Sequence, residues 1–141
     1  MSNHEREFIE ARTLSRLIIL IGERARADFA AAVAPLDLPV PLARALLYLD
    51  EATSMKELAE RLACDPSYIT SIADELEARG LVTRVPGEDR RVKLLQLTPN
   101  GTAVRERAAL AVSSQIDFAR RLDAGERETL RELLERLLQD E

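Results

Sequence analysis

Residues 53–98 read TSMKELAERLACDPSYITSIADELEARGLVTRVPGEDRRVKLLQLT, and their hydrophobic period changes along the way. Apolar residues recur every three or four positions as far as Gly80, which predicts two short helices, and alternate after it, which predicts strands. Roughly three residues separate the two helices, a spacing typical of a helix-turn-helix whose second helix faces outward. Because a cationic tip lies between the strands, we expect this segment to hold duplex DNA.

Local signals mark where each of these helices begins. Ser54 and Glu57 have the spacing of a capping box and open the first helix, residues 55–62. Asp65 and Pro66 supply a cap and a first-turn proline for the second helix. The residues predicted to face inward are Met55, Leu58, Ala59 and Leu62 in the first helix and Ile69, Ile72, Ala73 and Leu76 in the second.

A two-stranded hairpin is predicted after the second helix. Strands over residues 81–85 and 92–97 flank a tight tip, Pro86-Gly87-Glu88-Asp89, whose proline and glycine favour a turn. Leu95 and Leu97 are expected to face inward and Gln96 outward. The segment is therefore predicted to be a helix-turn-helix followed by a hairpin wing.

Longer helices are predicted on both sides of this segment. An amphipathic helix is expected over about residues 5–32, and a shorter one over about 41–49. Thr98 and Pro99 open a helix predicted to run to about Leu122, and Asp123 with Glu126 forms another capping box. The last helix carries a stripe of Leu130, Leu133, Leu134, Leu137 and Leu138. The predicted fold class is mainly α with a small β-hairpin wing.

The composition excludes several classes of protein. The chain has 141 residues, enough for one domain with a core, and no apolar run long enough for a spanning helix, so we expect a cytoplasmic protein without a membrane partner. Charges interrupt the N-terminal apolar residues, unlike those of a secretory leader. Cys64 is the one cysteine and His4 the one histidine, so we predict no metal, no cofactor and no enzymatic activity.

The charge is unevenly distributed along the chain. The formal net charge is −5, yet residues 81–105 carry 5 basic and 2 acidic groups. The other parts of the chain are acidic. Since non-specific affinity for DNA comes mainly from phosphate neutralisation, an acidic body with one basic projection favours a protein that binds a specific site.

These residues resemble the MarR family of bacterial winged helix-turn-helix regulators. The resemblance is carried by KELAERL (56–62), SYITSIADELEARGLV (67–82) and EDRRVKLLQLTPNG (88–101), and by the order of the flanking helices. It implies a single MarR-type domain over residues 1–141. Dimerisation helices are expected in residues 1–34 and 99–141, and a DNA-binding lobe in residues 40–98.

The resemblance also implies a function. We expect a sequence-specific transcriptional regulator, a repressor, that binds a pseudo-palindromic operator as a homodimer. The recognition helix would enter the major groove and the wing the adjacent minor groove, with half-sites roughly 34 Å apart. Two alternatives stay open: a winged-helix module that binds protein, and a redox-responsive regulator that uses Cys64. We favour a buried structural thiol at Cys64, because relatives that sense oxidants carry their cysteine near the first helix.

Particular residues are candidates for contact with DNA. On the recognition helix they are Pro66, Ser67, Tyr68, Thr70 and Ser71, and on the wing Arg84, Asp89, Arg90, Arg91 and Lys93. Asp89 is expected to hold Arg91 by a salt bridge. Ser71 replaces the arginine or lysine common at this position in the family, so we expect the wing to provide more of the contact with DNA. For Ser67 and Thr70 the alternative is a solvated first turn, and for Arg84, Arg90, Arg91 and Lys93 it is a solvated charged surface.

A small-molecule effector is the remaining partner that the resemblance implies. Its pocket would lie between the dimerisation helices and the DNA-binding lobe, and Arg16, Leu20 and Arg24 are the candidates on the first helix. The alternative is that these arginines belong to a solvated helix surface.

Overall fold

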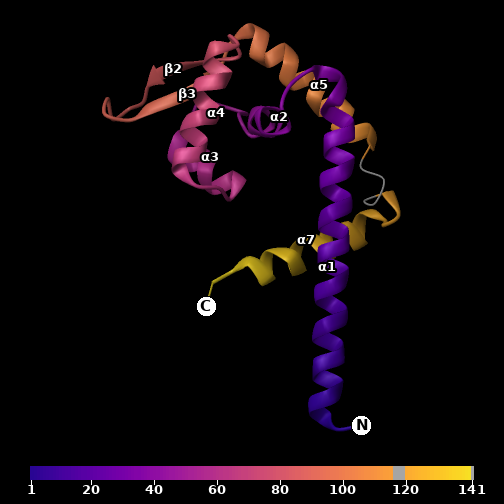
Figure 1. The fold of residues 1–141 in the computed structure, drawn as a ribbon. Helices are drawn as coiled ribbons and strands as arrows, with labels where there is room; N and C mark the ends of the chain where they lie inside the picture. The colour runs from indigo at the N-terminus through magenta and orange to yellow at the C-terminus, as the bar shows by residue number, and fades with distance from the viewer. Residues whose placement is uncertain (116–119, 141) are drawn as a thin grey trace. The chain divides into compact units, whose positions relative to one another are not determined.

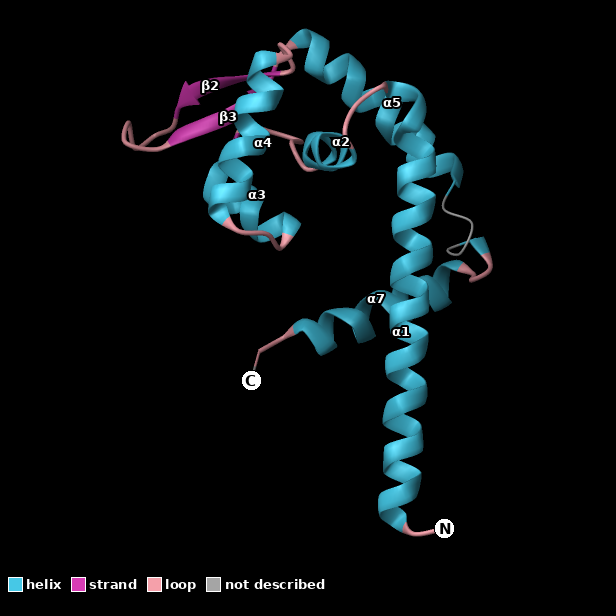
Figure 2. Ribbon diagram, in the orientation of Figure 1, coloured by secondary structure: helices cyan, strands magenta, loops and turns pink. Residues whose placement is uncertain are grey.

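The computed structural model describes residues 1–115 and 120–140 (Figure 1). In chain order the elements are α1 (Asn3–Val33), the 3₁₀ helix η1 (Ala34–Leu36), α2 (Val40–Leu47), β1 (Thr53–Ser54), α3 (Met55–Leu62), α4 (Pro66–Ala78), β2 (Val82–Pro86), β3 (Lys93–Leu97), α5 (Pro99–Gln115) and α7 (Ala124–Leu138). Helices predominate and the strands form one small sheet, which confirms the predicted fold class (Figure 2).

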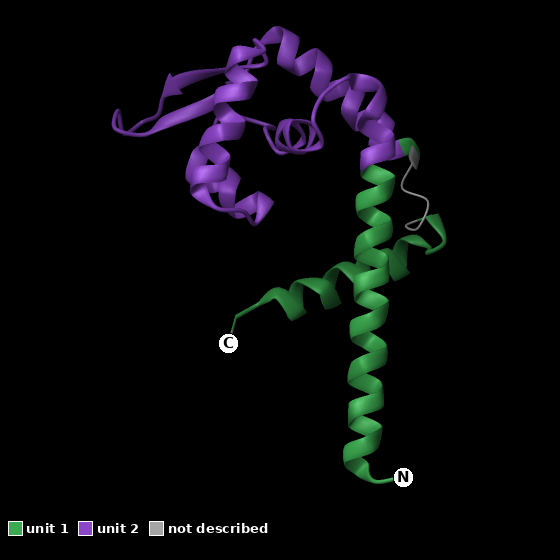
Figure 3. Ribbon diagram, viewed as in Figure 1, with its two compact units in different colours: residues 1–29, 114–141 green, residues 30–113 purple. Residues whose placement is uncertain are grey.

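The chain forms two compact units. One consists of residues 1–29 and 114–141, and the other of residues 30–113 (Figure 3). The second unit contains the predicted helix-turn-helix and wing together with the first part of α5. The assignment of residues 1–34 and 99–141 to dimerisation, and of residues 40–98 to DNA binding, stays a prediction.

The core of the second unit joins α2, α3, α4 and the sheet. It is formed by Leu42, Ala45, Leu46, Leu49, Leu58, Ala59, Ile69, Ile72, Ala73, Leu76, Leu81, Val82 and Leu95. All four residues predicted to face inward on α4 are buried, and burial of this apolar stripe is what fixes the opposite face outward. On α3, Leu58 and Ala59 are buried, whereas Met55 and Leu62 are partly buried against the core.

The predicted N-caps of α3 and α4 are present, but of the capping box predicted for Ser54 and Glu57 the described contacts include only the bond to Ser54. Ser54 Oγ accepts a hydrogen bond from the backbone N–H of Glu57 at 3.1 Å, and Asp65 Oδ1 accepts one from the N–H of Ser67 at 2.9 Å. Ala63 ends α3 in the left-handed conformation, with φ of 49°. The short turn between α3 and α4 is therefore set by one capped end on each side.

The sheet contains a strand that was not predicted. The strand order is β1-β3-β2, all antiparallel, and β1 places Thr53 opposite Leu95. Its two residues are too few to show a period, so a hairpin of two strands was predicted instead. Thr53 is fully buried, and its hydroxyl donates to the backbone oxygen of Glu51 at 2.8 Å.

Thr98 and Gly101 join the wing to α5. The Thr98 hydroxyl donates to the backbone oxygen of Gly80 at 2.6 Å and accepts from the N–H of Gly101 at 3.0 Å. Gly80 has a φ of 72°, a conformation that costs little without a side chain. Thr98 thus caps α5 as predicted. It also binds the backbone after α4, which was not predicted.

The end predicted for this helix is wrong. α5 ends at Gln115, and Leu122 lies in a bend rather than in a helix. Residues 116–119 of the predicted helix lie outside the described residues. The next predicted start is confirmed, because Asp123 and Glu126 form a reciprocal capping box at α7.

The unit that contains most of α1 exposes many large apolar side chains. They are Phe8, Ile9, Leu14, Leu17, Ile18, Ile19, Leu20 and Ile21 on α1 and Leu130, Leu133, Leu134, Leu137 and Leu138 on α7. Among the described residues no single helix is long and apolar enough to cross a membrane. The helices Asn3–Leu36 and Val40–Leu47 reach that length and composition only as a pair bent by 95°.

Candidate nucleic-acid interface

α4 presents a polar face to solvent. All the candidates on this helix, Pro66, Ser67, Tyr68, Thr70 and Ser71, are exposed, and so is Asp74. Hydroxyl groups beside the first turn of a helix suit contact with base edges or phosphates, because the N-terminal end also carries a partial positive charge. The structure therefore places these candidates together on the side of α4 opposite the core.

Two of these hydroxyl groups already donate within the protein. Ser67 Oγ donates to Asp65 Oδ1 at 2.6 Å, and Thr70 Oγ1 donates to the backbone oxygen of Pro66 at 3.2 Å. A hydroxyl has one hydrogen and two lone pairs, so in this arrangement both oxygens are left to accept. The base groups that donate in the major groove are the amino groups of adenine and cytosine. The Ser67 bonds also lower the pKa of Asp65, the side-chain bond more than the backbone bond.

The wing is a tight hairpin with exposed cations. The N–H of Gly87 donates to the oxygen of Val92, and the N–H of Val92 donates to the oxygen of Asp89, both at 2.9 Å. Arg90, Arg91 and Lys93 are exposed at or beside this tip. Figure 1 shows β2 and β3 running side by side from the region of α4 to the tip. The sheet thus holds three cationic side chains in solvent.

The salt bridge expected between Asp89 and Arg91 is not the contact that forms. Asp89 Oδ1 accepts from the backbone N–H of Arg91 at 3.0 Å, and the ion pairs of the described residues do not include these two side chains. A carboxylate two residues before an N–H readily closes such a turn without ordering a long side chain. Asp89 therefore shapes the backbone of the tip and leaves the Arg91 guanidinium exposed.

Arg84 does not resemble the other wing cations. Its Nη2 lies 2.5 Å from Asp74 Oδ1, and its Nε lies 3.9 Å from Glu77 Oε2, both on α4. The side chain is only 30% exposed, whereas Arg90, Arg91 and Lys93 are exposed. The sequence indicated a phosphate contact for Arg84, but the structure directs its charge to the recognition helix.

The residues predicted to bind an effector lie on α1. Arg16, Leu20 and Arg24 are spaced by four residues, share one helix face and are exposed. An open groove of about 760 Å³ lies between α3 and the start of α4 and is lined by Met55, Lys56, Ala59, Glu60, Ala63, Cys64, Asp65, Pro66 and Thr70. None of the three predicted residues lines this groove, so their role as an effector site stays a prediction.

Cys64 lies in the turn between α3 and α4 and packs against the core. It is partly rather than fully buried, because its side chain also lines the groove between these helices. Within the described part of the chain, no group of three or more His, Cys, Asp or Glu side chains is arranged to hold a metal ion.

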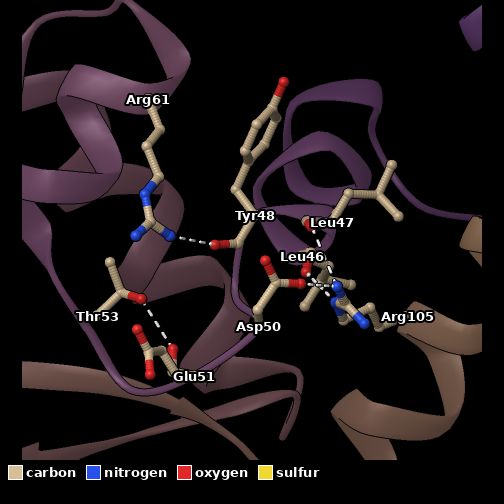
Figure 4. Close-up of polar contacts among 8 residues, drawn as sticks. All are labelled: Leu46, Leu47, Tyr48, Asp50, Glu51, Thr53, Arg61 and Arg105. Carbon is tan, nitrogen blue, oxygen red and sulfur yellow. Dashed lines mark hydrogen bonds and ion pairs between the residues drawn. The ribbon is translucent and has the colours of Figure 1, made fainter.

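Two arginines that the sequence did not single out bind the C-terminal end of α2 (Figure 4). Arg105 of α5 donates to the backbone oxygens of Leu46 at 3.2 Å and Leu47 at 3.4 Å, and pairs with Asp50. Arg61 of α3 donates to the backbone oxygen of Tyr48 at 3.1 Å. The last carbonyl groups of a helix lack partners within it. These contacts satisfy carbonyl groups at the end of α2 and tie α3 and α5 to α2. Because each arginine lies far along the sequence from the residue that it binds, no local pattern could reveal these contacts.

Comparison with known proteins finds a similarity to regulators of the MarR family. The model of the MarR family matches residues 45–93. A putative transcriptional regulatory protein for the hcr operon of Thauera aromatica is 40% identical over 86 residues, 60% of this chain and 52% of that protein. The organic hydroperoxide resistance transcriptional regulator of Bacillus subtilis is 35% identical over 50% of this chain and 48% of that protein. The chain thus spans about half the length of these curated relatives.

Other relatives match over nearly the whole chain. The multiple antibiotic resistance protein MarR of Escherichia coli is 29% identical, with 93% of this chain and 94% of that protein covered. The crystal structure of a mutant of MarR from E. coli complexed with operator DNA superposes with a TM-score of 0.77 at 28% identity, over 94% of this chain and 98% of that one. CouR of Rhodococcus jostii bound to p-coumaroyl-CoA gives a TM-score of 0.79 at 24% identity, over 91% and 95%, and shares the fold. The chain resembles these MarR-family proteins in sequence and in the order of its helix-turn-helix, wing and flanking helices.

Proposed function

We propose that the protein is a sequence-specific DNA-binding transcriptional regulator, a repressor, that acts in the cytoplasm as a homodimer. The observation that carries this proposal is a helix-turn-helix whose second helix exposes hydroxyl groups beside a hairpin with a cationic tip. The buried stripe of α4 and the antiparallel pairing of β2 with β3 hold both parts in one unit. Rigid presentation of this kind lowers the entropic cost of docking on DNA.

The two parts of the interface would do different work. α4 would lie in the major groove, where Ser67, Thr70 and Ser71 reach base edges. The wing would lie along the minor groove, where Arg90 or Arg91 gains from the negative potential of a narrow groove. Because Asp74, Glu75 and Glu77 make α4 acidic, the wing would supply most of the attraction to phosphate.

Exposed apolar side chains support the homodimer. The stripe of α7 is exposed from 38% at Leu130 to 82% at Leu138, and α1 exposes Ile18 by 53% and Ile19 by 60%. Contiguous apolar surface of this kind marks an interface in a protein that does not aggregate. A second copy of the chain is the partner we propose, because a two-fold dimer presents two recognition helices to a pseudo-palindromic operator with half-sites roughly 34 Å apart.

A small-molecule effector is a further partner that we propose for the homodimer, with Arg16, Leu20 and Arg24 as its candidate residues. The likeness to CouR, which was solved with p-coumaroyl-CoA, is one of fold. Calorimetric titration with aromatic acids and their coenzyme A thioesters, on wild type and on Arg16→Ala, would test this part of the proposal.

The main test is selection of bound duplexes from a random-sequence library, followed by affinity measurements against salt. We expect enrichment of a pseudo-palindrome and a steep fall of log affinity with log salt concentration, because each neutralised phosphate contributes about 0.9 to that slope. No enrichment, with a slope near zero, would contradict DNA binding and support the module that binds protein.

A further inference from the structure

Arg84 occupies the base of the wing, on the side of β2 that faces the core. Val82 is buried in the core, and side chains two residues apart on a strand share a face, so Arg84 follows Val82 toward α4. Its guanidinium meets Asp74 at 2.5 Å and approaches Glu77 at 3.9 Å. Arg84 Nε is buried without a hydrogen-bond partner, so the carboxylate of Glu77 is the charge that faces it.

The two carboxylates lie on the proposed reading face of α4. Asp74 follows Ser71 by three residues and Thr70 by four, and Glu77 follows Asp74 by three, so successive turns place them along one side of the helix. Asp74 is 62% exposed and Glu77 is 48% exposed. A carboxylate at this position would face the phosphates beside the major groove, and like charges repel.

We propose that Arg84 is a positioning residue for DNA binding that acts through Asp74 and Glu77 rather than by contact with phosphate. Its guanidinium neutralises the acidic side of the recognition helix and fixes the base of the wing against that helix. Both effects favour the pose in which α4 and the tip reach adjacent grooves. This inference rests on the proposed function, because it assigns Arg84 a part in binding DNA.

A double-mutant cycle tests the inference on a duplex selected by the wild type from a random library. We expect Arg84→Ala to weaken binding on the order of tenfold, because Asp74 and Glu77 are left uncompensated near phosphate. Asp74→Asn alone supplies the reference affinity for the cycle. The double variant, Arg84→Ala with Asp74→Asn, should recover part of the lost affinity, since it removes one of the two carboxylates that Arg84 neutralises.

The salt dependence separates this role from direct contact. Loss of a phosphate contact lowers the salt slope by about one for each protomer, so about two for a dimer. We expect Arg84→Ala to keep the wild-type slope and Lys93→Ala, on the neighbouring strand, to lower it. Arg79→Ala, at the exposed end of α4, makes the same change in net charge as Arg84→Ala and should keep an affinity near that of wild type.

Two results would overturn the role proposed for Arg84 but leave the proposed function standing. One is a lower salt slope for Arg84→Ala without recovery by Asp74→Asn, which would make Arg84 a phosphate contact; the other is unchanged affinity in Arg84→Ala. Thermal unfolding of each variant shows whether a loss of affinity comes from a loss of folded protein. Failure of folded wild type to bind any selected duplex would instead overturn the proposed function, and the inference with it.

Discussion

Gly101 lies where the first turn of α5 meets the backbone of Leu81. A Cβ atom at Gly101 would overlap the Leu81 carbonyl oxygen and lie 2.8 Å from its carbonyl carbon. The contact is with backbone, which cannot rotate away as a side chain can. At this scale the Leu-Thr-Pro-Asn-Gly run of residues 97–101 has a steric explanation: Thr98 caps the helix, and Gly101 lets the helix approach the chain that leaves α4.

Gly101→Ala is expected to destabilise the second unit by about 2 to 4 kcal/mol, because the added methyl group forces α5 away from Leu81. The matched control is Gly22→Ala in α1, where nothing lies within 4 Å of the added Cβ. There, better helix propensity should stabilise the protein by about 0.5 to 1 kcal/mol. Urea denaturation of both variants measures the difference, and a Gly101→Ala protein as stable as wild type would refute the steric account.

At the scale of elements, the parts predicted well are those with local causes. The caps at Ser54, Asp65 and Asp123 and the buried stripe of α4 depend on residues within a turn or two, so the sequence pattern reveals them. β1 forms only because Thr53 pairs with Leu95, far along the chain. Long-range contacts of this kind leave no periodic signal.

The candidate site divides in the same way. The exposed face of α4 could be predicted from the helical period of its apolar residues, and the exposed tip of the wing from its turn residues. The pairing of Arg84 with Asp74, and the binding of the α2 carbonyl groups by Arg105, depend on tertiary contacts. Asp89 was assigned to the right turn and to the right residue, Arg91, but to its side chain instead of its backbone N–H, because a carboxylate satisfies a nearby backbone N–H as readily as a guanidinium.

The Asp65 cap of α4 should make the free energy of unfolding depend on pH in the acid range. Hydrogen bonds from Ser67 hold the pKa of Asp65 below its ordinary value of 3.8. Between the folded-state and unfolded-state pKa values, the unfolded chain therefore binds more protons than the folded chain. The stabilisation by Asp65 is therefore complete above about pH 4 and is lost as the pH falls through the folded-state pKa. We expect Asp65→Ala to lower the Tm at pH 7. The gap in Tm between this variant and wild type should narrow below about pH 4.

Thermal unfolding followed by circular dichroism from pH 7 to pH 3 would measure that gap. Glu60→Ala, an exposed carboxylate on α3, is the control and should unfold near the wild-type Tm at pH 7. A gap for Asp65→Ala that widens in acid would mean that the carboxylate does not cap α4 in its charged form.

At the scale of the whole molecule, the apolar surfaces of α1 and α7 need a partner. Leu134 is 44% exposed in the single chain, so Leu134→Arg should leave the fold of one copy intact while placing a charge in the proposed dimer interface. We expect a shift to monomer at micromolar concentration and weaker binding to a two-half-site duplex. Light scattering after size exclusion would measure the mass of each species.

Glu132→Arg is the matched control for Leu134→Arg. Glu132 lies on α7 about 160° around the helix from Leu134, away from the leucine stripe, so an arginine there should leave the dimer unchanged although it changes the net charge by more. If Leu134→Arg stays dimeric, the leucine stripe of α7 is not part of the interface. If both variants become monomers, a general effect of charge on α7 is responsible instead.

The most direct measurement is the affinity of wild type and Arg91→Ala for a selected pseudo-palindromic duplex, determined over a range of salt concentrations. The account predicts steep salt dependence for wild type and a loss on the order of 1 to 3 kcal/mol in Arg91→Ala, because the exposed Arg91 guanidinium is proposed to enter the minor groove. Equal affinities for the two proteins at moderate salt would contradict the role of the wing. No measurable binding by folded wild type would contradict the proposed regulator itself.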